Sequence, residues 1–291
     1  MEGVEGGKGE HGLIGRWLRK PATRRSILKA GGSVAGGGLL TWGLHALGVR
    51  KDTFRDKEVQ IEDPAVDPFA GLSDQERKMA EGFVQKELAQ LKEREDTPAK
   101  LKLVNDYQGQ IEEAAQAAGF SSKLSKGVAF VENNGDPQAV AESGAAGIYM
   151  LKPDAASDAG ISPEERLIPE KNIEGGNGYL AQNLERFGRV DLAILSHHLG
   201  PGTVYDMVRA YIKRVRGVEL GDIRNETDVD KASMMKDAYL GEIATSKIAV
   251  FKLLSEPESV AKIPSEAKAE EPERYLYRVI AASDFVNQQT A

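Results

Sequence analysis

One glutamate stands out among the residues of this chain that could do chemistry. Residues 124–131 have the composition of an apolar helix, which ends in Glu132, and a Gly-Asp-Pro turn follows at residues 135–137. A carboxyl group at the end of such a helix is half surrounded by apolar side chains. Because burial disfavours the charged form, we expect Glu132 to keep a proton near neutral pH, as a general acid requires.

Three further motifs follow this helix along the chain. They read GAAGIYMLKP at residues 144–153, NIEGGNGYL at residues 172–180 and LAILSHHLGPG at residues 192–202. Together with the helix that ends at Glu132, they resemble the lytic transglycosylase family in order and separation. That family shows Glu-Ser at a helix end, then Gly-Ala-x-Gly-Leu-Met-Gln-x-x-Pro, Asn-Ile-x-x-Gly-x-x-Tyr-Leu and Ala-Tyr-Asn-Ala-Gly-Pro-Gly. The resemblance covers about a third of the chain.

The resemblance implies a fold, a reaction and a catalytic residue. The fold would be an all-α, lysozyme-like domain with flanking helices, and the substrate would be the glycan strands of peptidoglycan. Glu132 falls on the family's catalytic glutamate, which protonates the leaving oxygen and then, as a carboxylate, helps the sugar's own 6-hydroxyl attack the anomeric carbon. The bond between N-acetylmuramic acid and N-acetylglucosamine would be cleaved with a 1,6-anhydro end, without a second carboxylate, a metal or a cofactor.

The same motifs imply a substrate-binding set around Glu132. Its members are Asn133, Gly147, Ile148, Tyr149, Met150, His197 and His198. His197 could contact the carboxyl or the substrate, because imidazole both donates and accepts hydrogen bonds. Adjacent helix positions point about 100° apart, so the alternative is one histidine in the core and one in solvent. For Tyr149 we favour a place in the cleft, where it would stack on a sugar ring, over simple packing, whereas we expect Asn172 and Tyr179 to be structural.

Several departures from the family pattern fall at this site. Asn133 replaces the serine after the glutamate, and Ala141 stands where many members carry a serine that hydrogen-bonds the carboxyl. Met150 replaces a glutamine, and His197-His198 replaces Tyr-Asn. Alanine and methionine cannot replace the lost hydrogen bonds. An alternative interpretation is therefore a glycan-binding or scaffold protein of the cell envelope that does not cut; a true lysozyme, which usually needs a second carboxylate, ranks behind both.

The composition excludes several other classes of site. The chain has no cysteine, which rules out disulfides, thiolate metal sites and a cysteine nucleophile. After residue 45 its only histidines are the adjacent pair, so we expect no metal site. A net charge of −7 argues against a nucleic-acid partner, whose phosphates need a basic face.

The first fifty residues resemble an export signal. Residues 23–29 read TRRSILK, and residues 30–49 carry no formal charge and many glycines. Paired arginines before a weak apolar segment are typical of a twin-arginine signal, which the export machinery reads as an address. We therefore expect an exported protein in the periplasm or cell envelope. The alternative is a membrane tether at residues 30–49, since about 20 apolar residues suffice to span a bilayer.

The remaining sequence predicts helices that would position the site. We divide the chain into the signal or anchor (1–50), a linker with an N-terminal helix (51–97), the lysozyme-like domain (98–217) and a C-terminal helical region (218–291). A capping box at residues 73–76 predicts a helix to about residue 94, whose packing face would carry Met79, Phe83, Leu88 and Leu91. We expect further helices from Thr97 to Gly119 and from about Pro272, and no run has the alternation of a strand.

Overall fold

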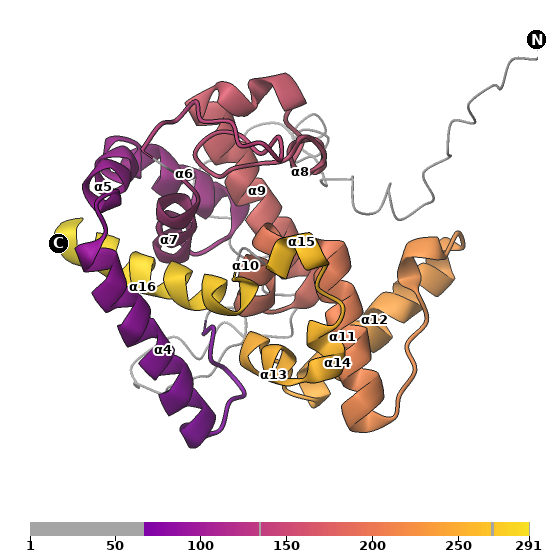
Figure 1. The fold of residues 1–291 in the computed structure, drawn as a ribbon. Helices are drawn as coiled ribbons and strands as arrows, with labels where there is room; N and C mark the ends of the chain where they lie inside the picture. Colours follow the sequence, from indigo (N-terminus) through magenta and orange to yellow (C-terminus); the bar gives the residue numbers. More distant parts are fainter. Residues whose placement is uncertain (1–66, 134, 269–270, 291) are drawn as a thin grey trace, which may run out of the picture. The chain divides into compact units, whose positions relative to one another are not determined.

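The catalytic helix predicted from the sequence lies among other helices in the computed structural model (Figure 1). The structure describes residues 67–133, 135–268 and 271–290. Within these ranges there are helices and two isolated β-bridges, Val140–Ala146 and Ala146–Leu151, but no strand. The prediction of an all-α fold is confirmed. The export signal and the tether predicted at residues 23–49 lie outside the described residues.

Helix α7 (Ser122–Glu132) ends at the predicted glutamate and is buried along most of its length. Ser121 caps it by accepting a hydrogen bond from the backbone N–H of Leu124 at 3.3 Å. The side chains from Leu124 to Phe130 are all buried. Helices α5 (Thr97–Asp106), α6 (Gln108–Ala118) and α16 (Pro272–Thr290) pack around it. A helix that is covered on all sides is largely apolar, and its buried Lys126 has a partner, because it donates to Glu112 of α6 at 2.9 Å.

The C-terminal helix α16 packs especially closely on α7. A Cβ atom at Gly127 would lie 2.9 Å from the Cβ of Ser283 and still closer to the carbonyl oxygen of Val279. Further along, the rings of Phe130 and Phe285 meet edge to face, with 5.9 Å between centroids. The last helix therefore belongs to the same hydrophobic core as α7, although it was predicted as part of a separate C-terminal region.

A second group of helices forms the other side of the site. It comprises α8 (Pro153–Asp158), the 3-10 helix η2 (Pro163–Leu167), α9 (Pro169–Phe187), α10 (Val190–Leu199) and α11 (Pro201–Arg216). Gly200, with φ +78°, makes the turn between α10 and α11, so that the histidine pair occupies the last turn of α10. The loop between α7 and α8 is held by Asn172 of α9, which accepts from the N–H of Tyr149 at 2.7 Å and donates to the Ala146 carbonyl at 2.9 Å.

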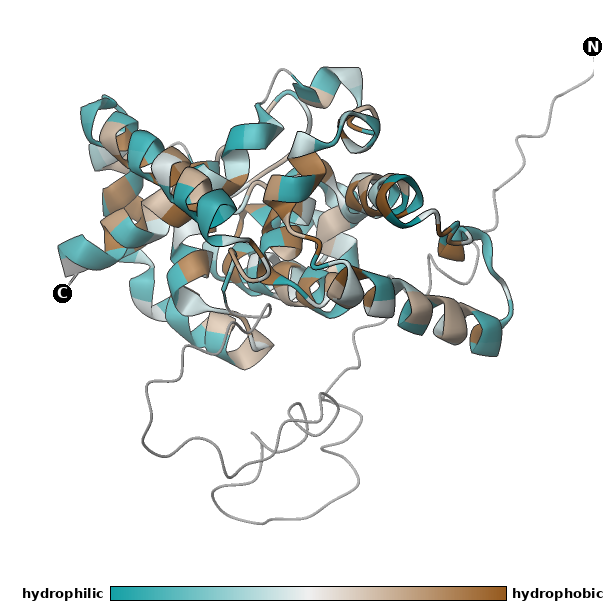
Figure 2. Ribbon diagram, turned by 90° about the horizontal axis from the view of Figure 1, so that it is seen from below, coloured by the Kyte–Doolittle hydropathy of each residue, from teal (hydrophilic) through white to brown (hydrophobic). Residues whose placement is uncertain are grey.

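The outer helices complete the described part of the chain. They are α4 (Asp74–Glu93), the 3-10 helix η3 (Ile223–Asn225), α12 (Val229–Thr245), α13 (Val250–Ser255), α14 (Pro257–Val260) and α15 (Ser265–Lys268). Hydrophobic and hydrophilic residues are interspersed along several of these helices in Figure 2. No helix in the described part of the chain is both long and apolar enough to span a membrane.

Helix α4 confirms its predicted start and half of its predicted packing face. Ser73 and Glu76 form the capping box. Leu91 is buried and Leu88 packs partly buried against the core, whereas Met79 and Phe83 are 50% and 44% exposed.

The other buried residues of α4 are Ala80, Val84 and Glu87. Arg274 of α16 donates to Glu87 at 2.7 Å, which makes burial of that acid tolerable.

The single helix predicted from Thr97 to Gly119 is two helices. Tyr107 leaves helical geometry between α5 and α6, with φ −109° and ψ 11°. Gly119 ends α6 in the left-handed region as expected. Thr97 does not cap α5 with its side chain; its hydroxyl donates to the Leu91 carbonyl at 2.5 Å and so joins α5 to the end of α4.

Candidate active site

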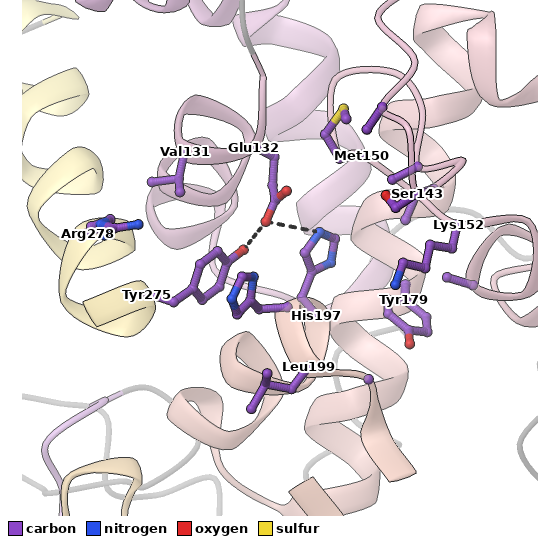
Figure 3. A pocket seen from close by; sticks show the side chains of 16 residues that line it. Val131, Glu132, Ser143, Met150, Lys152, Tyr179, His197, Leu199, Tyr275 and Arg278 are labelled. Carbon is purple, nitrogen blue, oxygen red and sulfur yellow. Dashed lines mark hydrogen bonds and ion pairs between the residues drawn. The ribbon is translucent and has the colours of Figure 1, made fainter. Parts of the chain in front are cut away.

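Glu132 lies on the wall of a cavity of about 380 Å³ (Figure 3). Its side chain is 16% exposed, so it is neither in bulk solvent nor sealed in the core. The end of α7, the loop over residues 141–152, the end of α10 and the first turns of α16 all contribute to the walls. Among the described residues that line this cavity, Glu132 is the only acid. The Glu132 carboxyl can therefore contact a ligand in the cavity, although most of its surface is covered by protein.

Two polar side chains lie close to the same carboxylate oxygen. The hydroxyl of Tyr275, on α16, donates a hydrogen bond to Oε1 of Glu132. Nε2 of His197 lies 3.9 Å from that oxygen and 3.0 Å from the carbonyl oxygen of Tyr149. Since a carbonyl only accepts, Nε2 of His197 carries a proton and donates it to Tyr149. Burial lowers the pKa of His197 to about 4, so this ring is a neutral neighbour of Glu132 and not an ion-pair partner at neutral pH.

His198 packs against Tyr275 and is not simply exposed to solvent. Its ring stacks on that of Tyr275, with 4.2 Å between centroids and 9° between planes. Burial also lowers the pKa of His198 to about 4, helped by the nearby charges of Arg278 and Lys152. Burial raises the pKa of Tyr275 well above its usual range, and the negative charge of Glu132 adds to this effect. Tyr275 therefore keeps its proton, and its hydroxyl remains a donor.

Basic groups lie at the edges of the site. Lys152 and Arg278 line the cavity, and Arg278 is paired with Glu271 and lies 3.5 Å from Glu87. Behind the end of α7, the amino group of Lys100 donates to the Val131 carbonyl at 3.3 Å. A cation near the last carbonyls of a helix is favoured by the helix dipole, although burial lowers the pKa of Lys100.

The structure brings three of the predicted binding residues to the cavity beside Glu132. Met150, His197 and His198 all line it, so the histidine pair is not divided between core and solvent. Met150 reaches the cavity from a left-handed backbone conformation, with φ +43°. The other predicted binding residues, Asn133, Gly147, Ile148 and Tyr149, do not line the cavity.

Asn133 and Gly147 shape the backbone around the site. The buried side chain of Asn133 closes the end of α7: its amide donates to the Ala129 carbonyl, and its oxygen accepts from the N–H of Gly135 at 2.9 Å. Gly147 has φ +79°, and a Cβ there would lie 2.5 Å from the carbonyl oxygen of Arg166. Both residues therefore act through the local backbone and not through contact with the cavity.

Ile148 and Tyr149 pack in the core, which corrects the expectation that Tyr149 faces the cleft. Both side chains are fully buried. The Tyr149 hydroxyl lies 2.6 Å from that of Ser125 on α7 and accepts from the amide of Asn177 on α9 at 3.2 Å. A phenol that is satisfied between two helices cannot also stack on a sugar. Tyr149 serves the site through its backbone carbonyl, which holds His197.

Asn172 has the structural role that we expected, whereas Tyr179 also reaches the cavity. Asn172 is fully buried and its amide donates to the carbonyl of Arg166 as well as to the loop. The ring of Tyr179 lies against His197, with 5.9 Å between centroids, and its edge lines the cavity. Burial raises the pKa of Tyr179 to about 12. The ring of Tyr149 is a second aromatic neighbour of His197, with 6.3 Å between centroids, and the two rings together limit how the imidazole can turn.

Sequence reasoning missed Tyr275. It was predicted only as a residue of the last helix, and nothing in its spacing links it to a glutamate 143 positions earlier. Ser143, Lys152 and Arg278 also line the cavity without having been predicted. Within the described residues, no group of three or more histidine or acidic side chains is arranged to hold a metal ion. The arrangement offers one acid, one phenol donor and two neutral imidazoles.

Comparisons with known proteins match the segment that contains Glu132 to one family. Residues 109–215 match the family model of the transglycosylase SLT domain, from the start of α6 to the end of α11. The chain is 34% identical over 125 residues to membrane-bound lytic murein transglycosylase F 1 of Alkalilimnicola ehrlichii, which covers 40% of this chain and 24% of that protein. It is 33% identical over 87 residues to a transglycosylase of Enterobacteria phage PRD1. This aligned segment covers 30% of the present chain and 32% of the phage protein. The chain thus spans about a quarter to a third of these curated relatives.

Proposed function

We propose that this chain, whose residues 109–215 match the transglycosylase SLT domain, is an exported lytic transglycosylase. Its substrate would be the bond between N-acetylmuramic acid and N-acetylglucosamine in peptidoglycan, and its product would carry a 1,6-anhydro end. One observation carries the proposal: a single partly buried carboxyl, Glu132, stands on the wall of a cavity that is lined mostly by residues of that segment. A lysozyme-type reaction usually needs a second carboxylate across the bond, and no other acid lines the described cavity.

The reaction can be written with one acid that acts twice. Glu132 first gives its proton to the glycosidic oxygen, and the bond from that oxygen to the anomeric carbon breaks. The resulting carboxylate then accepts the proton of the sugar's 6-hydroxyl while that oxygen bonds to the anomeric carbon. The proton lost in the first step is regained in the second, and no water is consumed. The neutral state of His197 leaves the carboxyl as the group that exchanges protons.

A second candidate function is a groove that binds glycan without cutting it. Ala141 and Met150 both line the cavity where the resemblance leads us to expect serine and glutamine. Neither side chain can donate the hydrogen bond that the family residue would give. This observation favours a binding protein, unless another group supplies the missing donor.

Digestion of peptidoglycan sacculi separates the two functions. We expect the wild-type protein to release anhydro-muropeptides detectable by mass spectrometry, and Glu132→Gln to lower the rate by about 10²–10⁴-fold, the usual contribution of a general acid–base group. Glu142→Gln is the matched control, because Glu142 is exposed on the neighbouring loop and does not line the cavity. Binding to sacculi without released fragments would establish the second function, and an active Glu132→Gln protein would refute the first.

A further inference from the structure

We infer that Lys152 binds a carboxylate on the substituent that muramic acid carries, so that the cavity binds anionic glycan more tightly than neutral glycan. The inference rests on the proposed function for its substrate and deepens it, because it names the feature of the glycan that the same site recognises. Lys152 lines the cavity that contains Glu132. In the view of Figure 3, Lys152 lies on one side of Glu132 and Arg278 on the other.

The first argument is that Lys152 supplies a positive charge that the protein itself does not neutralise. Among the described residues that line the cavity, the charged side chains are Glu132, Lys152 and Arg278. Arg278 is paired with Glu271, and its Nε lies 3.5 Å from Oε2 of Glu87, so acids of the protein already offset its charge. Lys152 is exposed and is paired with no acid of the described ranges. Its ammonium group is therefore the cation that a ligand in this cavity can use.

The second argument is that hydrogen bonds fix the backbone on both sides of Lys152. The N–H of Leu151 donates to the Ala146 carbonyl at 2.9 Å, and the Leu151 carbonyl accepts from Arg166 at 2.8 Å. The carbonyl of Lys152 itself accepts from the N–H of Ala156 at 3.0 Å, in the first turn of α8. The long side chain thus extends from a fixed base while its ammonium group stays hydrated. Only side-chain torsions remain to be ordered when a ligand binds.

The third argument is that the charge of Lys152 acts on the space beside the acid. Together with Arg278, it helps burial to lower the pKa of His198. The ring of His198 stacks on Tyr275, whose hydroxyl donates to Glu132. A sugar bound beside Glu132 would therefore lie within the field of this lysine.

The proposed substrate carries the charge that Lys152 lacks. Muramic acid differs from glucosamine by a lactyl ether, which ends in a carboxyl group. In intact peptidoglycan this carboxyl forms an amide with a stem peptide that has free carboxylates of its own, and in strands without peptides the lactyl carboxylate is free. A lysine ammonium can pair with either as a point charge. A chain with a net charge of −7 repels such an anion overall, so a local cation is needed to bind it.

Replacement of Lys152 by methionine tests the inference, with Lys78→Met as the matched control. Methionine keeps most of the unbranched side chain and removes the charge, whereas Lys152→Arg keeps the charge and should rescue binding. Lys78 is an exposed lysine of α4 and does not line the cavity. All changes are made in Glu132→Gln protein, so that the glycan stays intact while calorimetry measures Kd.

Three ligands separate the possible sources of the carboxylate. They are a muramidase-released glycan fragment with its stem peptides, the same fragment after an amidase has removed the peptides, and a neutral N-acetylglucosamine oligomer of equal length. We expect Lys152→Met to raise Kd about three- to tenfold for an anionic fragment, between the loss of an exposed ion pair and that of a buried charge-assisted hydrogen bond. Kd for the neutral oligomer should stay within about twofold. Added salt should weaken binding of the anionic fragment less in Lys152→Met than in the protein that keeps the lysine.

Each outcome decides the inference. A loss with the peptide-bearing fragment alone assigns the carboxylate to the stem peptide, and a loss with the amidase-treated fragment assigns it to the lactyl group. An equal loss with the neutral oligomer would show that the charge is not what binds. That result, an unchanged Kd for both anionic fragments, or no binding of either by protein that keeps Lys152 would overturn the inference.

The binding measurement can fail or succeed separately from the proposed function. Wild-type protein that cuts sacculi while Lys152→Met leaves Kd unchanged would refute the role of the lysine and leave the cleavage reaction intact. Protein that binds anionic fragments through Lys152 but releases nothing from sacculi would refute the cleavage and keep the lysine as part of a glycan-binding groove.

Discussion

At the scale of single residues, the imidazoles and the phenol around Glu132 carry no charge at neutral pH, while Lys152 and Arg278 line the same cavity. His197 and His198 are kept neutral by burial, and Tyr275 keeps its proton for the same reason. A neutral neighbour orients a carboxyl without fixing it in the ionised state, whereas an adjacent cation would hold it as a carboxylate. This difference matters for an acid that must first donate a proton.

Burial of His197 makes the stability of the protein depend on pH. Its pKa is lowered to about 4 in the folded state and is near 6.5 when unfolded. The unfolded chain therefore takes up the proton first as pH falls, so this contribution to stability is complete above pH 6.5 and is lost as pH falls toward 4. We expect the free energy of unfolding to fall less between pH 7 and 4.5 in His197→Gln than in the wild type, by on the order of 2 kcal/mol.

Denaturant titrations at the two pH values check this expectation. Glutamine is neutral and can still donate to the Tyr149 carbonyl, so the hydrogen bond itself is conserved. Parallel loss of stability in both proteins would show that His197 is not the group responsible.

The sequence located the carboxyl that lines the cavity better than it located the residues around it. Glu132 was found because an apolar run, a terminal acid and a turn occur together within a short segment. Tyr149 was misplaced because a motif specifies the position of a residue but not which of its atoms faces a cavity. Tyr275 was missed because its contact with Glu132 depends on how two helices from distant parts of the chain pack.

At the scale of helices, the approach of α16 to α7 brings Tyr275 to Glu132. Gly127 sits where the two backbones are closest, so it has a packing role in addition to its place in the apolar run. Glycine in a helix interior costs about 1 kcal/mol relative to alanine, and the close approach offsets this cost. The packing of α16 on α7 at Gly127 therefore also affects the position of Tyr275 beside Glu132.

Gly127→Ala should separate the helices and weaken both stability and activity. The Cβ would meet the backbone of Val279, which cannot rotate away as a side chain does. We expect a net loss of about 1–3 kcal/mol in the free energy of unfolding, as for other overpacked cores, despite the gain in helix propensity. The same change at Gly82 of α4, where nothing lies within 4 Å, should stabilise the protein by up to about 1 kcal/mol. Chemical denaturation measures both, and a stabilised Gly127→Ala protein would contradict the packing argument.

Helix ends were predictable where a local signal marks them, and helix faces were less so. In the capping box, the side chains of Ser73 and Glu76 accept from backbone N–H groups of the same helix turn, and Gly119 ends its helix through its own left-handed backbone; both signals are local and were located from the sequence. Met79 and Phe83 were assigned to the packing face by their helical spacing with Leu88 and Leu91. The buried face also includes Glu87, because the partner helix α16 supplies Arg274 as a donor for this acid, and nothing in the local spacing indicates that ion pair.

At the scale of the whole molecule, the core extends beyond the segment that matches the family. Buried residues from Phe69 to Val286 form one hydrophobic cluster. The predicted boundary at residue 217 marks the end of the recognisable motifs, but α16 returns to pack on α7 and α4. The chain has no cysteine, so this core can form without oxidation, on either side of a membrane.

The proposed export through residues 23–29 can be tested in intact cells. Replacing Arg24 and Arg25 by lysine keeps the charge but removes the arginine pair that the twin-arginine receptor is expected to read. We expect the variant to accumulate in the cytoplasm while the wild type is recovered from the periplasm or envelope. Fractionation followed by immunoblotting measures this, and alkaline extraction distinguishes released protein from protein tethered through residues 30–49. Equal export of both proteins would refute the signal.

The position of α16 also has a practical consequence for how the protein can be divided. A fragment cut at residues 109–215 would expose the buried face of α7 and lose the wall of the cavity that carries the phenol donor. Such a fragment would be expected to aggregate or to fail in glycan cleavage for lack of its last helix. Its failure would then be due to the missing helix and not to Glu132. The activity of Glu132 can therefore be tested only in a chain that retains α16.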